Sequence, residues 1–136
     1  MVRLTLNIEA INKLNFLNAQ WKFEPIYKSY EEFKKELERI TSIEDDSSRI
    51  KQINLFWKEM LNKKQIPFRF NDKVAFLYKG NYDSVYWNGD FNSWGKSKSI
   101  DNKGKRVNNS DIWILEYSFP PDARIDYKIV RDTIDK

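Results

Sequence analysis

Residues 85–94 read Val85-Tyr86-Trp87-Asn88-Gly89-Asp90-Phe91-Asn92-Ser93-Trp94, and the rest of the chain is organised around them. The first three residues of this stretch, Val85 to Trp87, predict a strand, because β-branched and aromatic side chains pack well on a pleated surface. The segment Asn88-Gly89-Asp90 tolerates positive φ and offers local side-chain hydrogen bonds, which predicts a tight turn. Phe91 and Trp94 follow, and rings of this size either cover the core or form a platform for a ligand.

The composition suits one domain with an aromatic core. The 136 residues are 40% hydrophobic and include 5 Trp, 7 Tyr and 9 Phe, which argues against a disordered chain. The net charge of +4 is a mild imbalance, so we expect no nucleic-acid partner. No apolar run approaches the roughly 20 residues of a membrane span, so we expect no membrane partner.

Cysteine and histidine are absent from the sequence. This excludes a Ser-His-Asp or Cys-His nucleophilic site and a His-ligated zinc site within the chain. The lack of cysteine leaves the cellular compartment open, because secreted and cytoplasmic proteins can both do without disulfides.

Two amphipathic helices are predicted between residues 29 and 64. Ser29-Tyr30-Glu31-Glu32 is a capping box, and one apolar face follows it. The segment Glu44–Ser47 supplies caps for the second helix, and Pro67 closes it. The two apolar stripes consist of Tyr30, Phe33, Leu37 and Ile40 in the first helix, and of Ile50, Ile53, Phe56 or Trp57, and Met60 or Leu61 in the second. We expect the helices to pack on each other or on a sheet. Helical spacing also predicts a helix near 7–18.

From Phe68 the periodicity changes to twofold, which predicts strands over 73–79, 84–88, 112–119 and 125–130. Short alternating strands separated by turns are typical of a β-sandwich. Trp87 and Trp113 fall on the inward alternation, so we expect them in the core, whereas Tyr86 points the other way. The fold class is therefore α+β, with a helical segment at 1–65 and an antiparallel β-sandwich domain at 66–136.

Four stretches together resemble the early-set immunoglobulin-like domain that precedes the catalytic domain in enterochelin-esterase-like proteins and related esterases. They read Val74-Ala75-Phe76-Leu77-Tyr78-Lys79-Gly80, then residues 85–94, then Asp111-Ile112-Trp113, then Pro120-Pro121-Asp122-Ala123-Arg124-Ile125-Asp126-Tyr127-Lys128. The resemblance covers about residues 55–132, and glycogen-binding modules are more distant relatives in it.

The resemblance implies an accessory role. In those esterases the module lies before an α/β-hydrolase domain with Gly-x-Ser-x-Gly and a histidine, and neither is present here. We therefore expect a non-catalytic accessory domain without a cofactor, either a fragment or an isolated module, whose partner is an α/β-hydrolase domain of the same protein. It would position that domain or shape its substrate entrance.

The alternative is a carbohydrate-binding module that recognises a glucan or a related oligosaccharide. In the glycogen-binding relatives, the tryptophan matching Trp94 stacks on sugar rings and the lysine matching Lys128 helps to hold the sugar. With Asn92 and Tyr86, these residues form the predicted ligand site. The alternatives are that Trp94 closes the core and that Lys128 is an ordinary exposed lysine. The relatives also have a second platform tryptophan, which has no aromatic counterpart in residues 132–136.

Two groups of loop residues have further readings. Four aspartates, Asp83, Asp90, Asp101 and Asp111, lack the spacing of an EF-hand, so we expect them to form turns and expect no metal site. A basic loop beside the aromatic turn could bind an anionic polymer or serve only as a soluble loop. It contains Lys96, Lys98, Lys103, Lys105 and Arg106.

Overall fold

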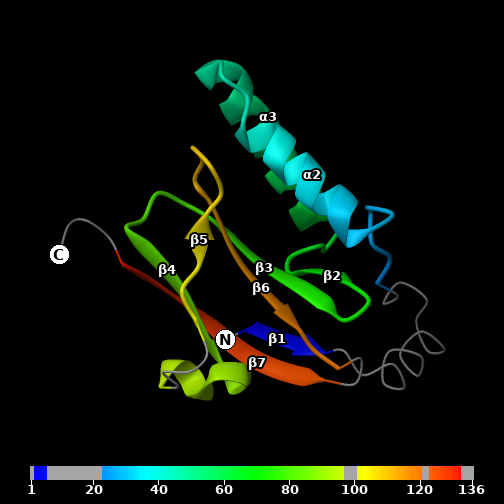
Figure 1. The fold of residues 1–136 in the computed structure, drawn as a ribbon, viewed down its shortest axis with the longest axis vertical. Coiled ribbons are helices and arrows are strands. Elements are labelled where there is room, and N and C mark those ends of the chain that lie inside the picture. The colour runs from blue at the N-terminus through cyan, green and yellow to red at the C-terminus, as the bar shows by residue number, and fades with distance from the viewer. Residues whose placement is uncertain (1, 6–22, 97–100, 121–122, 133–136) are drawn as a thin grey trace.

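The computed structural model describes residues 2–5, 23–96, 101–120 and 123–132, and shows an α+β fold (Figure 1). Two helices precede most of the strands, and the strands form two antiparallel sheets. The elements are β1 (Val2–Thr5), α2 (Tyr30–Thr41), α3 (Asp46–Asn62), β2 (Phe68–Phe70), β3 (Lys73–Lys79), β4 (Ser84–Gly89), the 3-10 helix η2 (Asp90–Gly95), β5 (Lys105–Arg106), β6 (Ile112–Ser118) and β7 (Arg124–Asp132).

The strands pair in two groups, which we name sheet A and sheet B. Sheet A has the order β1-β7-β4, and sheet B has the order β2-β3-β6-β5. The centre of sheet B is the β3–β6 pair, which runs from Lys73 opposite Ser118 to Lys79 opposite Ile112. In sheet A, β4 pairs with β7 along its whole length, from Ser84 opposite Asp132 to Gly89 opposite Tyr127.

The two amphipathic helices predicted between residues 29 and 64 form, and each begins at a side-chain cap. The Ser29 hydroxyl accepts a hydrogen bond from the Glu32 amide at 3.0 Å. The Glu32 carboxylate accepts from the Lys28 amide at 3.0 Å, one residue earlier than a standard capping box expects. Helix α3 begins after Asp45, whose carboxylate accepts from the Ser48 amide at 2.8 Å.

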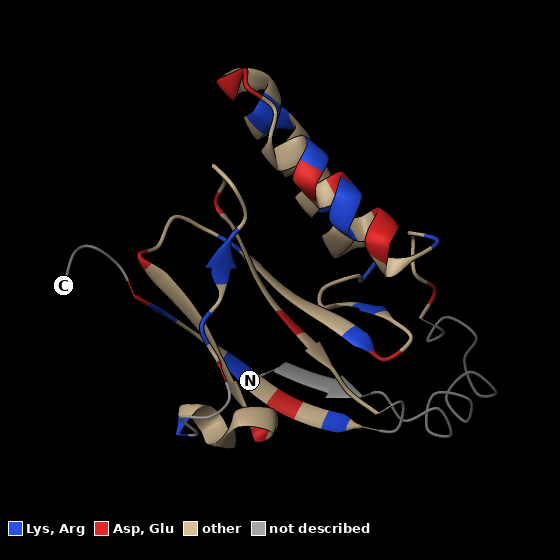
Figure 2. Ribbon diagram, viewed as in Figure 1, with Lys and Arg blue, Asp and Glu red and all other residues tan. Residues whose placement is uncertain are grey.

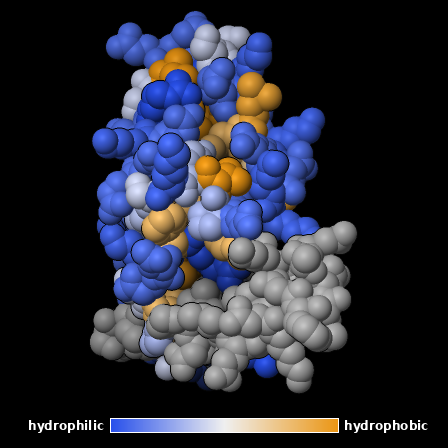
Figure 3. Space-filling view, turned by 90° about the vertical axis from the view of Figure 1, so that its right-hand side faces the viewer, coloured by the Kyte–Doolittle hydropathy of each residue, from blue (hydrophilic) through white to orange (hydrophobic). Residues whose placement is uncertain are grey.

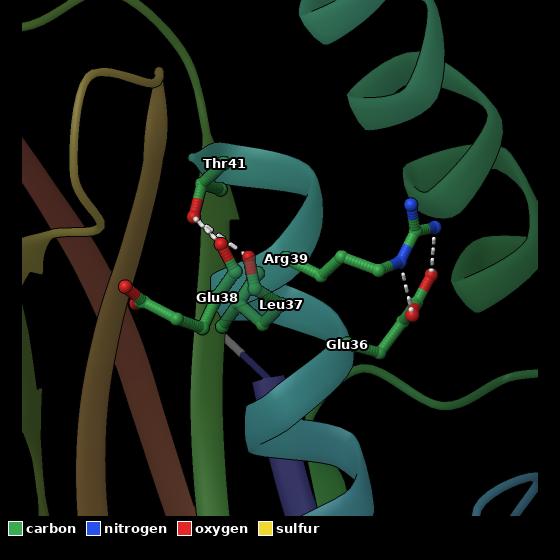
Figure 4. Close-up of polar contacts among 5 residues, drawn as sticks. All are labelled: Glu36, Leu37, Glu38, Arg39 and Thr41. Atoms are coloured by element: carbon green, nitrogen blue, oxygen red, sulfur yellow. Dashed lines mark hydrogen bonds and ion pairs between the residues drawn. The ribbon is translucent and has the colours of Figure 1, made fainter. Parts of the chain in front are cut away.

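The last turns of α2 are closed by contacts within the helix (Figure 4). The Thr41 hydroxyl donates to the Leu37 carbonyl at 2.7 Å, and the Arg39 guanidinium pairs with the Glu36 carboxylate at 2.7 Å. The Thr41 side chain is buried, and this bond, with the one that it accepts from the Asn108 amide at 3.0 Å, satisfies its hydroxyl.

The helices and the two sheets form three layers with two hydrophobic cores between them. The first core joins the helices to sheet B and includes Phe33, Met60 and Leu77. The second joins the two sheets and includes Phe76 and Trp87. The helices therefore cover the outer face of sheet B, as Figure 1 shows, while sheet A lies on its other side.

This layering explains the apolar residues at both parities of β3. Ala75 and Leu77 belong to the core under the helices, whereas Val74 and Phe76 belong to the core between the sheets. The predicted core positions of Trp87 and Trp113 are confirmed, because their side chains are only 0% and 4% exposed.

Several expectations need correction or lie outside the described residues. On α3 the buried stripe is Ile53, Phe56 and Met60, whereas Ile50 and Leu61 are exposed. The short strands β1, β2 and β5 were not predicted. The predicted helix near 7–18 lies outside the described residues. Among those that are described, no helix is both long and apolar enough to cross a membrane.

Candidate binding face on sheet A

The turn after β4 is built around the buried side chain of Asn92. Its amide nitrogen donates to the Trp87 carbonyl at 2.7 Å, and its amide oxygen accepts from the Gly89 and Gly95 amides at 3.0 and 3.2 Å. A single side chain thus ties the last residues of β4 to the end of η2. The Asn92 side chain is 0% exposed, and both polar atoms of its amide bond to the backbone of the turn.

The same turn brings Trp94 to the edge of sheet A. Trp94 is half-buried and has φ of 58°, and the following Gly95 has φ of 88°. This left-handed backbone suits glycine. A Cβ on Gly95 would also lie 2.6 Å from Oδ1 of Asn88, so the turn folds back against a β4 side chain.

The strand register places Asn88 on the outer face of sheet A, together with two of the predicted site residues. Trp87 faces the core, so its neighbours Tyr86 and Asn88 face outward. Tyr86 pairs with Val130, and Asn88 pairs with Lys128. Tyr86 and Lys128 are therefore diagonal neighbours on one face, and Lys128 is exposed.

A segment within the basic loop extends this face beyond the edge of β4. The Trp87 amide donates to the Asn102 carbonyl at 2.9 Å, and the Gly104 amide donates to the Val85 carbonyl at 2.7 Å. The Asn102 side chain donates to Oδ1 of Asn88 at 2.6 Å. A Cβ on Gly104 would lie 2.4 Å from the Trp87 ring, so glycine permits this close approach.

The structure thus brings Tyr86 and Lys128 together and places Trp94 in the turn beside them. Asn92 lies beneath this face and holds the turn, and its role as a ligand contact stays a prediction. Sequence reasoning missed Asn88 and Asn102. The alternation that turns Tyr86 outward could have identified Asn88, but Asn102 lies in a polar loop without a periodic signal.

The loop aspartates take part in turns or pairs. The Asp90 carboxylate accepts from the Asp126 amide at 3.0 Å, and the Asp101 carboxylate accepts from the Lys103 amide at 2.9 Å. Asp111 pairs with Lys79 at 3.0 Å. Within the described ranges, no three His, Cys, Asp or Glu residues gather in a way that could hold a metal ion.

A second polar cluster lies where α2 meets β6. The Tyr30 hydroxyl donates to Glu116 at 2.5 Å, and the Lys34 ammonium pairs with the other carboxylate oxygen at 2.6 Å. Burial alone would raise the pKa of Glu116, but the hydrogen bonds from Lys34 and Tyr30 outweigh it and hold this pKa below its usual range. Burial and the bond to Glu116 raise the pKa of Tyr30. The cluster therefore fixes the helix to the sheet.

The helical layer offers a less convincing site. A hollow of about 510 Å³ lies between α2 and α3, with Tyr27 and Leu55 among its lining residues. Burial, with the nearby carboxylates, raises the pKa of Tyr27 to about 12, so its hydroxyl stays protonated. On the face shown in Figure 3, apolar side chains form separate spots among polar ones, which is ordinary for a protein surface.

Comparisons with known proteins found no match: no family model, no curated protein and no solved structure is similar to this chain. The expected kinship with early-set domains therefore stays a prediction from the sequence.

Proposed function

We propose that this chain is a non-catalytic module that binds a glycan on the outer face of sheet A. One observation carries the proposal. The contact between Gly95 and Asn88 seats the Trp94 turn against a face that also presents Tyr86 and Lys128. As a finer assignment, we propose an immunoglobulin-like sandwich of the early-set type, which the two packed antiparallel sheets support.

The chemistry of this face suits a sugar chain. An aromatic ring complements the apolar C–H face of a pyranose, and Trp94 and Tyr86 supply two such rings. Amide and ammonium groups hydrogen-bond hydroxyls, and Asn88, Asn102 and Lys128 supply them. Helices α2 and α3 cover sheet B rather than sheet A, so neither lies over these residues.

Titration with soluble glucans and xylo-oligosaccharides, followed by tryptophan fluorescence, tests the proposal. We expect saturable binding by the wild type and a loss of at least about tenfold in affinity for Trp94→Ala, since stacking on an aromatic ring contributes roughly 1–3 kcal/mol where it has been measured for bases. Lys128→Ala should also weaken binding. Its matched control is Lys35→Ala, at an exposed position of α2, which should not. No response of the folded wild type to any glycan would exclude this function.

The second candidate is the accessory domain of an esterase. The same open face could dock an α/β-hydrolase domain of the same protein, because the helices already occupy the outer face of sheet B. Extending the gene sequence on both sides of this stretch tests it. An adjoining domain with Gly-x-Ser-x-Gly would support the accessory role, and flanking sequence without such a domain would reject it.

A further inference from the structure

Two arginines contact the same tyrosine at the end of the molecule where β3 connects to β4. The connecting loop contains Tyr82, and both guanidinium groups contact this residue. Arg106 of β5 donates to the Tyr82 carbonyl at 2.9 Å, and Arg131 of β7 donates to the Tyr82 hydroxyl at 3.1 Å. Residues from both sheets therefore converge on one tyrosine, and Figure 2 shows β5 as a wholly basic strand at this end.

Arg131 lies against two aromatic rings that also contact each other. Its guanidinium carbon lies 5.8 Å from the ring centre of Tyr78 and 5.2 Å from that of Tyr82. The same guanidinium also donates a hydrogen bond to the Tyr78 hydroxyl. These contacts fix the orientation of a side chain that is otherwise rich in rotamers.

Arg106 is fixed in a similar way. Its guanidinium carbon lies 4.9 Å from the ring centre of Trp113. The Trp113 indole is itself held by a hydrogen bond from its Nε1 to the Gly80 carbonyl at 2.9 Å. A buried ring with a fixed orientation thus supports this cation.

Neither guanidinium is neutralised by a carboxylate of the described residues. Among the residues that the structure describes, no carboxylate forms an ion pair with Arg106 or Arg131, and both side chains are exposed. Two acidic groups near this end have other partners, whereas Asp83, which directly follows Tyr82, is exposed. Asp111 pairs with Lys79 at 3.0 Å, and the Asp132 carboxylate accepts from the Ser84 hydroxyl at 3.1 Å. A guanidinium has more N–H donors than the bonds described here use.

We propose that Arg106, Arg131 and Tyr82 form a binding site for a tetrahedral oxyanion, a phosphate or sulfate group. The planar guanidinium of arginine presents pairs of N–H donors whose spacing matches two oxygens of such a group. Hydrogen bonds between these charged partners are stronger than those between neutral groups. Because ring contacts and hydrogen bonds already order both side chains, less conformational entropy is lost on binding. The site does not depend on the glycan proposal, because Arg131 alternates with Lys128 and Val130 and so leaves sheet A on its other side.

Titration of the ¹⁵N-labelled protein with sodium sulfate and with sodium phosphate, against sodium chloride at equal ionic strength, tests the site. We expect saturable shifts of the amide signals around Tyr82, Arg106 and Arg131 with the oxyanions and none with chloride. The double variant R106Q/R131Q should bind at least about tenfold more weakly, since it loses both charged donor groups of the site.

The matched control is Arg124→Gln, an exposed arginine at the opposite end of β7, which should leave the affinity unchanged. Amide spectra without added salt establish that each variant is folded. Binding of only sulfate or only phosphate would support the site and show which of the two oxyanions it prefers. Equal shifts with chloride, or unchanged affinity in the folded double variant, would overturn the proposal.

Discussion

The two sheets of this protein bury their faces differently. In sheet B, β3 and β6 lie between two cores, so neighbouring residues such as Phe76 and Leu77 are both buried. In sheet A, β4 buries Trp87 and turns Tyr86 outward. Sheet B therefore packs side chains on both of its faces, whereas the described part of sheet A has polar and aromatic side chains on its outer face that a ligand could contact.

The largest effect should come from the buried side of β4. Trp87→Ala removes a fully buried ring from the core between the sheets, and we expect a loss of about 3–5 kcal/mol in the free energy of unfolding. Denaturant unfolding monitored by far-UV circular dichroism measures it. A loss below about 1 kcal/mol would contradict the two-core description.

Next in size should be the loss of the Asn92 side chain. Asn92→Ala leaves the Gly89 and Gly95 amides and the Trp87 carbonyl without their partner. We expect a loss of about 2–3 kcal/mol, because an unsatisfied buried polar group costs roughly 1–3 kcal/mol. The same unfolding measurement applies, with the exposed Ser93→Ala as control. If the two substitutions cost the same, Asn92 does not hold the turn.

A smaller, pH-dependent effect is expected where the helices join sheet B. Glu116→Gln breaks the pair with Lys34, and because the pair is partly exposed we expect a loss of only about 0.5–1 kcal/mol at neutral pH. The pKa of Glu116 is lowered in the folded state, so its stabilisation is present above the ordinary glutamate pKa and is lost as the pH falls through the lowered value.

The wild type should therefore lose more stability on acidification than Glu116→Gln does, in the range below about pH 4.5. Unfolding curves at pH 7, 4 and 3 measure the difference, with Glu44→Gln at an exposed position as control. Parallel pH profiles for wild type and Glu116→Gln would show that this carboxylate does not stabilise the helix–sheet junction.

The smallest change in stability should come from the outer face of sheet A. Tyr86→Ala removes a half-buried ring from that face, and we expect a loss of at most about 0.5 kcal/mol in the free energy of unfolding. Its glycan affinity, measured by the fluorescence titration, should fall. A stability loss close to that of Trp87→Ala would mean that this face is also packed, and the contrast between the sheets would fail.

The sequence predicted the elements whose side chains repeat with a clear period. The Ser29 cap and the face from Phe33 to Ile40 gave α2, and the alternation around Trp87 gave β4. Among the strands, 73–79 was predicted with the bounds that β3 has. The apolar residues at both parities of β3 were visible in the sequence, but only the contact with the helices explains them.

The missed elements are defined by their partners. The two residues of β5, Lys105 and Arg106, are polar and exposed, and they form a strand only through pairing with Ile114 and Trp113. Likewise, β1 is recognised by its pairing with β7. At the candidate site, alternation predicted the direction of Tyr86. No local pattern could reveal that the Asn92 amide would be buried by three backbone contacts, because these arise only when the turn closes.

The segment from Asn102 to Asn108 links all three layers. It bonds to the edge of β4 through the Asn102 carbonyl and to β6 through β5, and the Asn108 amide then donates to Glu38 and Thr41 of α2 at 2.7 and 3.0 Å. Movement of one layer relative to another would therefore break hydrogen bonds of this segment. A ligand that reorders the edge of β4 would be expected to disturb the C-terminal end of α2 through the same bonds.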